Sequence, residues 1–204
     1  MSKQISPDQD IYVAPGMLGK FIGSQPIVID QMNENHELDP TDLDHKILIY
    51  EREVKSWFLR PAKKLLEQDS FTNSLIVLMI CMAYLEGVEQ YKCGNNSQGR
   101  SKEYFVNSIE RVFPSEYSIQ ERENLYKKTR CGLFHTGMVA SGVLFNNGDD
   151  YPALQFGSDN TITVNPTRLL RNIEEDFEQY ISELKSRAIG DTKRSSFNRL
   201  FSVL

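Results

Sequence analysis

The feature that most constrains this fold is an apolar run, Leu75–Ala83, inside a segment of helical spacing from about Phe71 to Lys92. A helix that is apolar on every side has no face for water, so it lies in a protein core or in a membrane. The longest apolar stretch, Leu75–Leu85, is far shorter than the roughly 20 residues that a membrane span needs. A central core helix is therefore predicted. Its polar second half, with Tyr84 and Glu86, is expected to emerge towards solvent or a cleft.

Four further helices are expected where apolar residues recur every three or four positions. Pro61 is expected to break or kink the first of these helices. Ser118 and Glu121 form a capping box, which fixes the start of the third near Ile119. The expected helices cover about residues 42–68, about 101–113, from 119 past His135, and about 166–188.

The segments outside the helices differ in composition. Residues 1–40 are acidic and rich in proline and glycine, and short strands are expected at Ile11–Val13 and Ile27–Ile29. Short strands divided by turn residues are also expected at about 143–164, as a small β appendage that could pair with those early apolar runs. The basic and apolar tail, residues 189–204, is expected to be solvated, to contact RNA or to pack as a terminal helix. The predicted domains are an irregular segment 1–40, a helical domain 41–188 with the β insertion, and the tail.

The charge is unevenly distributed. The chain carries a net charge of −5, and residues 1–45 hold eight acidic residues against two lysines, a balance of −6, which leaves +1 for residues 46–204. The main body therefore does not resemble a strongly basic duplex-DNA binder, although a small cleft for single-stranded RNA is compatible with it. The acidic segment could lie over such a cleft and weaken RNA entry, or it could be a structural appendage.

The cysteines and histidines indicate neither a disulfide framework nor a metal site. Cys81, Cys93 and Cys131 are odd in number and lack C-x-x-C spacing, so reduced thiols are expected. His36 and His45 lie near carboxylates, but their spacing matches no familiar ligand pattern. The first residues also lack the apolar run of a secretory signal. We therefore expect a cytoplasmic protein with no membrane contact, no metal and no cofactor.

The strongest chemical signal is the stretch Thr129–Met138, which holds Arg130 and His135. A guanidinium binds phosphate oxygens as a fork, and imidazole titrates near neutral pH, so the pair suits phosphodiester chemistry. Lys127 and Lys128 add local positive charge. On an ideal helix the arginine and histidine diverge by roughly 140°, which makes one copy an awkward active site. Two copies facing each other across a two-fold axis passing near the stretch could combine the arginine of one with the histidine of the other.

Arg130, four intervening residues and His135, late in a helical chain of this size, resemble the R-x4-6-H motif of the HEPN family. The resemblance implies a mainly α fold, an antiparallel bundle of about five helices, here with a small β appendage. It also implies a homodimer that cleaves RNA as a metal-independent endoribonuclease, a hydrolase with Arg130 and His135 as catalytic residues. Tyr84 and Glu86 would flank the dimer cleft and contact substrate.

Three alternatives stay open at this motif. Other HEPN proteins bind nucleotides or act as inactive modules, and the family often has Asn, Asp or His directly after the arginine, where this chain has Cys131. The alternative function is thus a non-catalytic dimerisation or partner-binding module, for example beside a nucleotidyltransferase antitoxin in a toxin-antitoxin or defence system. Gly132 either permits close approach of another backbone or a phosphate, or marks an early helix end. Cys131 either pairs with His135 or faces a packed neighbour.

Overall fold

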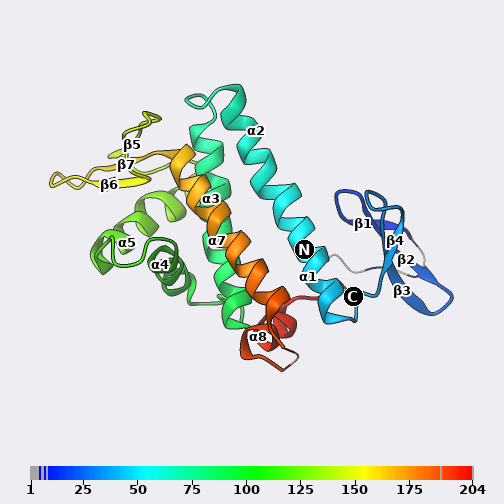
Figure 1. Ribbon diagram of the computed structural model, residues 1–204. Helices are drawn as coiled ribbons and strands as arrows, with labels where there is room; N and C mark the ends of the chain where they lie inside the picture. Colours follow the sequence, from blue (N-terminus) through cyan, green and yellow to red (C-terminus); the bar gives the residue numbers. More distant parts are fainter. Residues whose placement is uncertain (1–4, 6, 8, 189, 204) are drawn as a thin grey trace. The chain divides into compact units, whose positions relative to one another are not determined.

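The computed structural model describes residues 5, 7, 9–188 and 190–203 (Figure 1). Lys3 and Asp8, which count in the charge balance, lie outside the described residues, as do Ile189 and Leu204 of the tail. The chain forms two compact units. One unit contains residues 1–60, 91–95 and 179–204, and the other contains residues 61–90 and 96–178.

The first unit contains a four-stranded antiparallel sheet. Its strands follow the chain in the order β1-β2-β3-β4. Gly16 and Gly23 have φ angles of 73° and 64° in the two tight turns that join the first three strands, a conformation that glycine adopts without strain. The expected runs at Ile11–Val13 and Ile27–Ile29 fall in the first and third strands. The bounds are β1 Ile11–Ala14, β2 Met17–Ile22, β3 Gln25–Asp30 and β4 His36–Leu38.

A helix with a wide turn follows this sheet. Helix α1 (Leu43–Val54) begins at Asp42, whose side chain accepts a hydrogen bond from the His45 backbone N–H. It continues through the π-helical turn η1 (Lys55–Leu59) into α2 (Arg60–Gln68). The predicted break at Pro61 is therefore a widened turn just before the proline, which has no N–H to donate to the preceding turn.

The C-terminal residues pack as a terminal helix, one of the three outcomes considered for the tail. Helix α8 (Thr192–Leu200) buries Phe197, whose ring lies 5.3 Å from that of Tyr50. Arg194 is buried as well, and its guanidinium donates to Asp44 at 2.7 Å and to the Leu184 carbonyl at 3.0 Å. The charge of Arg194, one of the basic residues of the tail, therefore stabilises the fold.

The second unit is built around α3 (Ser74–Cys93), as predicted. Val77, Leu78, Cys81, Met82 and Leu85 have no exposed surface. Helix α3 is also long and apolar enough to cross a membrane, a property that the core helix of a soluble protein shares, and half of its most apolar window is buried. The predicted capping box opens α5. The other helical segments are α4 (Ser101–Val112), α5 (Ile119–Leu125), η2 (Tyr126–Cys131), α6 (Gly132–Thr136) and α7 (Pro166–Ser186).

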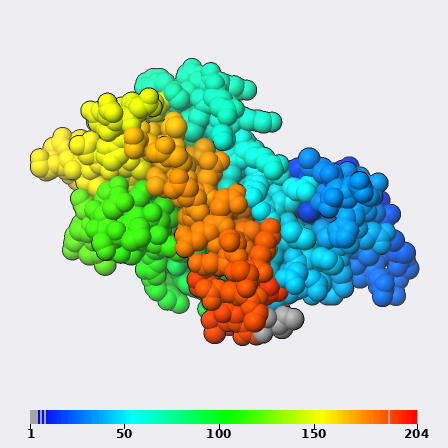
Figure 2. Space-filling model, in the orientation of Figure 1, coloured from blue at the N-terminus to red at the C-terminus, as the bar shows by residue number. Residues whose placement is uncertain are grey.

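A small three-stranded sheet lies against α5. The strands β5 (Val143–Phe145), β6 (Leu154–Phe156) and β7 (Ile162–Val164) pair in the order β5-β7-β6. Asn124 of α5 donates to Asn160 in the turn before β7 at 2.7 Å. The yellow strands and the green helices are in contact in Figure 2. The prediction that these strands pair with the early apolar runs is wrong, because the two sheets are separate.

The predicted fold class, a mainly α HEPN-like bundle with a small β appendage, is also wrong. The described residues are 54% helical, in six helices when the adjoining segments α1-η1-α2 and α5-η2-α6 are each counted as one, and they include two sheets, so the fold is a mixed α and β one. The error lies in residues 11–38, which were predicted to be largely irregular. Strand β2 alternates buried and partly exposed positions and includes Gly19 and Lys20, so it contains no continuous apolar run.

Candidate functional site

Arg130 is held by an ion pair inside the second unit. It lies in η2, where the helical segment that starts at the capping box widens for one turn. Its Nε donates to Glu86 Oε2 of α3 at 2.8 Å, and the side chains are only 20% and 12% exposed. Partial burial strengthens such a pair relative to a surface ion pair, because less water screens it. The predicted site residues Arg130 and Glu86 are therefore brought together.

The carboxylate of Glu86 is itself fixed from the other side. Its Oε1 accepts a hydrogen bond from Ser97 Oγ at 2.8 Å. The backbone N–H of Ser97 donates to Gln90 Oε1 at 2.9 Å, which ties the loop after α3 back to that helix. Both Glu86 oxygens thus have partners, and the carboxylate serves as a rigid support for the guanidinium.

Two aromatic rings complete the setting of Arg130. The guanidinium carbon lies 5.7 Å from the Tyr126 ring centroid and 5.0 Å from that of Phe134. These residues stand four positions before and four positions after the arginine, a spacing that brings side chains to one face of a helix. Attraction between a cation and ring faces stabilises this arrangement. Among the described residues, none accepts a hydrogen bond from Nη1 or Nη2 of Arg130, so the outer fork is available to a ligand.

His135 lies on the next turn and is exposed. Helix α6 ends directly after it, at Gly137, which has a φ of 75°. A Cβ atom on Gly132 would lie 2.6 Å from the carbonyl oxygen of Met138 and 3.1 Å from the amide nitrogen of Ala140. Gly132 thus does permit a close backbone approach, but the backbone is that of the same chain. Residues 138–140 therefore cover Gly132, and the predicted two-fold axis near this glycine would run into them.

The other predicted site residues are divided between the surface and the core. Lys127 is exposed, next to Tyr126. Lys128 donates from Nζ to the Asn160 carbonyl, so its charge is used to hold the small sheet. Tyr84 is 4% exposed, and its hydroxyl donates to Asp176 Oδ2 at 2.9 Å.

Tyr84 and Glu86 therefore do not flank one cleft, which corrects that prediction. Residues two apart on a helix point roughly 200° apart, so the polar end of α3 serves two separate networks. On the Tyr84 side, Arg111 of α4 bridges Asp176 of α7 and Glu89 of α3. Burial alone would lower the pKa of Arg111, but the neighbouring carboxylates raise it, so this network is a charged tie between three helices.

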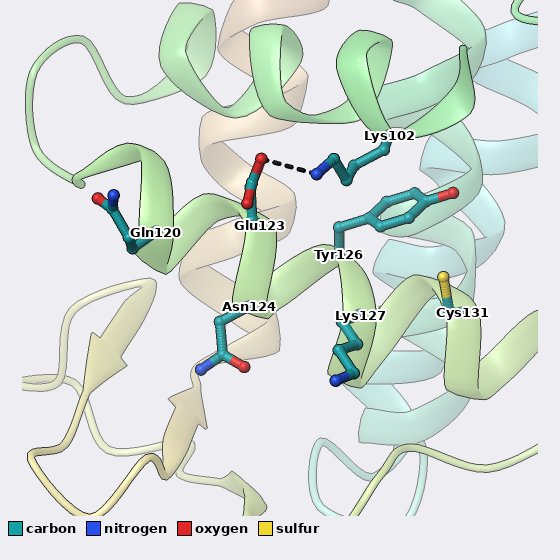
Figure 3. A pocket seen from close by; sticks show the side chains of 7 residues that line it. All are labelled: Lys102, Gln120, Glu123, Asn124, Tyr126, Lys127 and Cys131. Carbon is teal, nitrogen blue, oxygen red and sulfur yellow. Dashed lines mark ion pairs between the residues drawn. The ribbon is translucent and has the colours of Figure 1, made fainter.

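A cavity of about 380 Å³ opens beside the Arg130 site. Lys102 of α4 lines one side, and Asn124, Tyr126, Lys127 and Cys131 line the other (Figure 3). Burial raises the pKa of Tyr126, and so does its interaction with the Cys131 thiol. Cys131 therefore faces Tyr126, which answers the open question about its neighbour.

The described part of the chain contains no group of three or more His, Cys, Asp or Glu side chains that could hold a metal ion. The His36 and His45 rings lie 6.3 Å apart, and His45 Nδ1 accepts a hydrogen bond from the Asp39 backbone N–H at 2.9 Å. These histidines belong to the packing around the start of α1.

Three residues of the site escaped prediction: Ser97, Tyr126 and Phe134. Tyr126 and Phe134 could have been predicted from the sequence, because each is four positions from Arg130 and therefore on the same face of a helix. Ser97 had none, since it lies in a loop 11 positions from Glu86. Comparison with protein-family models, with curated proteins and with solved structures found no match. The function must therefore be inferred from the site itself.

Proposed function

We propose that this chain is a metal-independent endoribonuclease of HEPN type. The observation that carries the proposal is the setting of Arg130, whose Nε is bonded to Glu86 while the outer nitrogens of its fork stay available. A guanidinium held this way is already oriented to bind two oxygens of a phosphodiester. The exposed His135, one turn further, supplies an imidazole that can accept or donate a proton.

Each residue has a defined role in this reaction. The 2′-oxygen attacks the adjacent phosphorus, so an O–P bond forms and the bond from phosphorus to the 5′-oxygen breaks. His135 takes the proton from the 2′-hydroxyl or gives one to the leaving 5′-oxygen, and solvent completes the other transfer. Arg130 stabilises the negative charge that grows on the phosphate oxygens. The products are a 2′,3′-cyclic phosphate and a 5′-hydroxyl.

We also propose that the active form is a homodimer. Ile76, Ile80, Ala83 and Gly87 follow each other along one side of α3; Ile76 is 48% exposed, and a Cβ on Gly87 would meet nothing within 4 Å. Phe134 and Met138 of the motif segment are 47% and 58% exposed. A second copy is a suitable cover for these exposed apolar side chains. It could also combine the arginine of one copy with the histidine of the other, because residues five positions apart on an ideal helix diverge by roughly 140°.

The nuclease proposal is tested by cleavage of a labelled single-stranded RNA in the presence of EDTA. Cleavage by the wild type should disappear in Arg130→Ala and in His135→Ala, while circular dichroism shows that both variants are folded. Mixing the two variants should restore part of the activity if each composite site needs one residue from each copy. Undiminished cleavage in both variants would refute the assignment.

The second candidate function is a non-catalytic module that binds a partner, such as a nucleotidyltransferase antitoxin. The same exposed apolar residues, Ile76, Phe134 and Met138, favour it, and so does Cys131 in place of a polar residue. Overexpression separates the two functions. Growth arrest that His135→Ala relieves supports the nuclease, whereas harmless expression with a co-purifying partner supports the module.

A further inference from the structure

We infer that the cavity beside Arg130 binds one nucleobase of a single-stranded RNA, with the base stacked on Tyr126. The inference rests on the proposed function for the choice of RNA as ligand. It adds a base-selecting subsite next to the phosphate-binding arginine. Tyr126 is the link between the two, since its ring lines the cavity and lies 5.7 Å from the Arg130 guanidinium carbon.

The Tyr126 ring is held in place. Phe105 of α4 is fully buried and lies behind it, with the two ring centroids 5.4 Å apart. The wide turn η2 begins at Tyr126, and such turns in helices often occur at functional sites. A ring that is fixed in advance loses little conformational entropy when a flat ligand stacks on it.

The rim of the cavity carries groups that suit a nucleotide. Lys102 of α4 forms an ion pair with Glu123 of α5 at 2.8 Å, which joins the two sides of the cavity (Figure 3). The Asn124 amide is oriented by its bond to Asn160 at 2.7 Å. Lys127 adds a second positive charge on the same rim. An aromatic ring, an amide and Lys127 match the flat base, polar edge and charged backbone of a nucleotide, while the charge of Lys102 is balanced by Glu123.

This combination favours single-stranded RNA over the other ligand classes. A phosphate alone needs no ring, and an apolar peptide segment does not favour two lysines and a glutamate at the rim. A base inside a duplex cannot reach a side chain in a cavity, whereas an unpaired base can be splayed out and stacked on one. The volume of about 380 Å³ lies in the range of small-ligand sites.

The test measures binding, so that it does not depend on cleavage. A fluorescent 2′-O-methyl oligoribonucleotide, which lacks the attacking hydroxyl, is titrated with the full chain and followed by anisotropy. Tyr126→Ala should weaken binding by about 10-fold to 100-fold, the usual effect of losing one stacked base, whereas Tyr126→Phe keeps a ring and should stay within about 3-fold. Tyr151→Ala, which removes an exposed ring outside the cavity lining, is the matched control and should bind like the wild type.

Tyr126→Ala could also unfold the chain, since the ring packs on Phe105. A second measurement therefore uses the wild type alone. RNA that contains 4-thiouridine is irradiated with the protein, and the cross-linked peptide is identified by mass spectrometry. A cross-link within residues 120–131 supports the inference. Cross-links found only elsewhere, or wild-type protein that binds no RNA, overturn it.

The outcomes separate this inference from the proposed nuclease. A chain that binds RNA through Tyr126 but cleaves none would support the base subsite and refute the nuclease. A chain that cleaves RNA equally well with Tyr126→Ala, at substrate concentrations below saturation, would support the nuclease and refute the base subsite.

Discussion

Removing the Glu86 carboxylate should cost both stability and the orientation of Arg130. Glu86 accepts one hydrogen bond from the charged Arg130 Nε and one from the neutral Ser97 Oγ, both at 2.8 Å. Both bonds end on the ionised carboxylate, and losing a hydrogen bond to a charged group costs about 1.5–3 kcal/mol. Glu86→Ala should therefore lower the free energy of unfolding by about 3–6 kcal/mol, and Glu86→Gln, which keeps the shape but not the charge, by about half of that.

Urea denaturation measures these losses, and a double-mutant cycle assigns them. If Glu86 acts mainly through Arg130, the combined variant Glu86→Ala with Arg130→Ala should show a coupling of about 1–3 kcal/mol. Glu103→Gln is the control, because Glu103 also pairs with an arginine, Arg100, but on the exposed surface of α4. That substitution should leave the free energy of unfolding unchanged.

In the proposed nuclease, the same variants should also affect cleavage. Without its carboxylate partner, Arg130 would no longer be fixed towards the phosphate, and misplacement of a catalytic group by about 1 Å can cost about 100-fold in rate. Glu86→Gln should thus cleave RNA far more slowly than Glu103→Gln although both are folded. A Glu86→Ala protein as stable as Glu103→Gln, with no coupling to Arg130, would refute the idea that Glu86 supports the arginine.

Three further predictions concern the fold. Gly132→Ala should destabilise the chain by about 1–3 kcal/mol, because its Cβ would lie 2.6 Å from a backbone oxygen, whereas Gly87→Ala, with open space at its Cβ, should stabilise it by about 0.5–1 kcal/mol. Exposed Cys93 should react with a thiol reagent in the native protein, while Cys81, whose pKa is raised by burial, should react only after denaturation. Burial raises the pKa of Glu174, so its charged form lowers the stability of the fold at neutral pH. Glu174→Gln should therefore raise the Tm at pH 7. This gain should be lost once the pH falls below the ordinary carboxyl pKa of about 4.3, where Glu174 is protonated in both the folded and the unfolded chain.

Each of these predictions has a clear contrary result. Equal stability of the two glycine variants would show that the segment after α6 does not press on Gly132. Labelling of Cys81 in the native protein would mean that α3 is not the centre of the core. A Tm difference for Glu174→Gln that grows as the pH falls would reverse the sign of the linkage.

Features set by neighbouring residues could be predicted from the sequence. The capping box at Ser118 and Glu121 involves residues three positions apart, and the central position of α3 follows from its own apolar run. Strand β2 could not be recognised in this way, because only one of its faces is buried and Lys20 and Gly19 interrupt the apolar pattern.

The candidate site shows the same limit. Arg130 and His135 were predicted as site residues from their chemistry, their spacing and the resemblance to the HEPN motif. The partner of Arg130 lies 44 positions away, so its pairing depends on how α3 and η2 pack. Tyr84 was misplaced for a related reason, since Tyr84 and Glu86 are neighbours in sequence but point to different sides of α3.

The central claim is that Arg130 and His135 cleave RNA, and single-turnover kinetics in EDTA test it most directly. The wild type should convert a labelled single-stranded RNA to products ending in a 2′,3′-cyclic phosphate. His135→Ala and Arg130→Ala should each slow this step by about 100-fold or more, as expected when a general acid-base group or a charge-stabilising group is lost, and added imidazole should partly rescue only His135→Ala. Equal rates for the wild type and both folded variants would contradict the account.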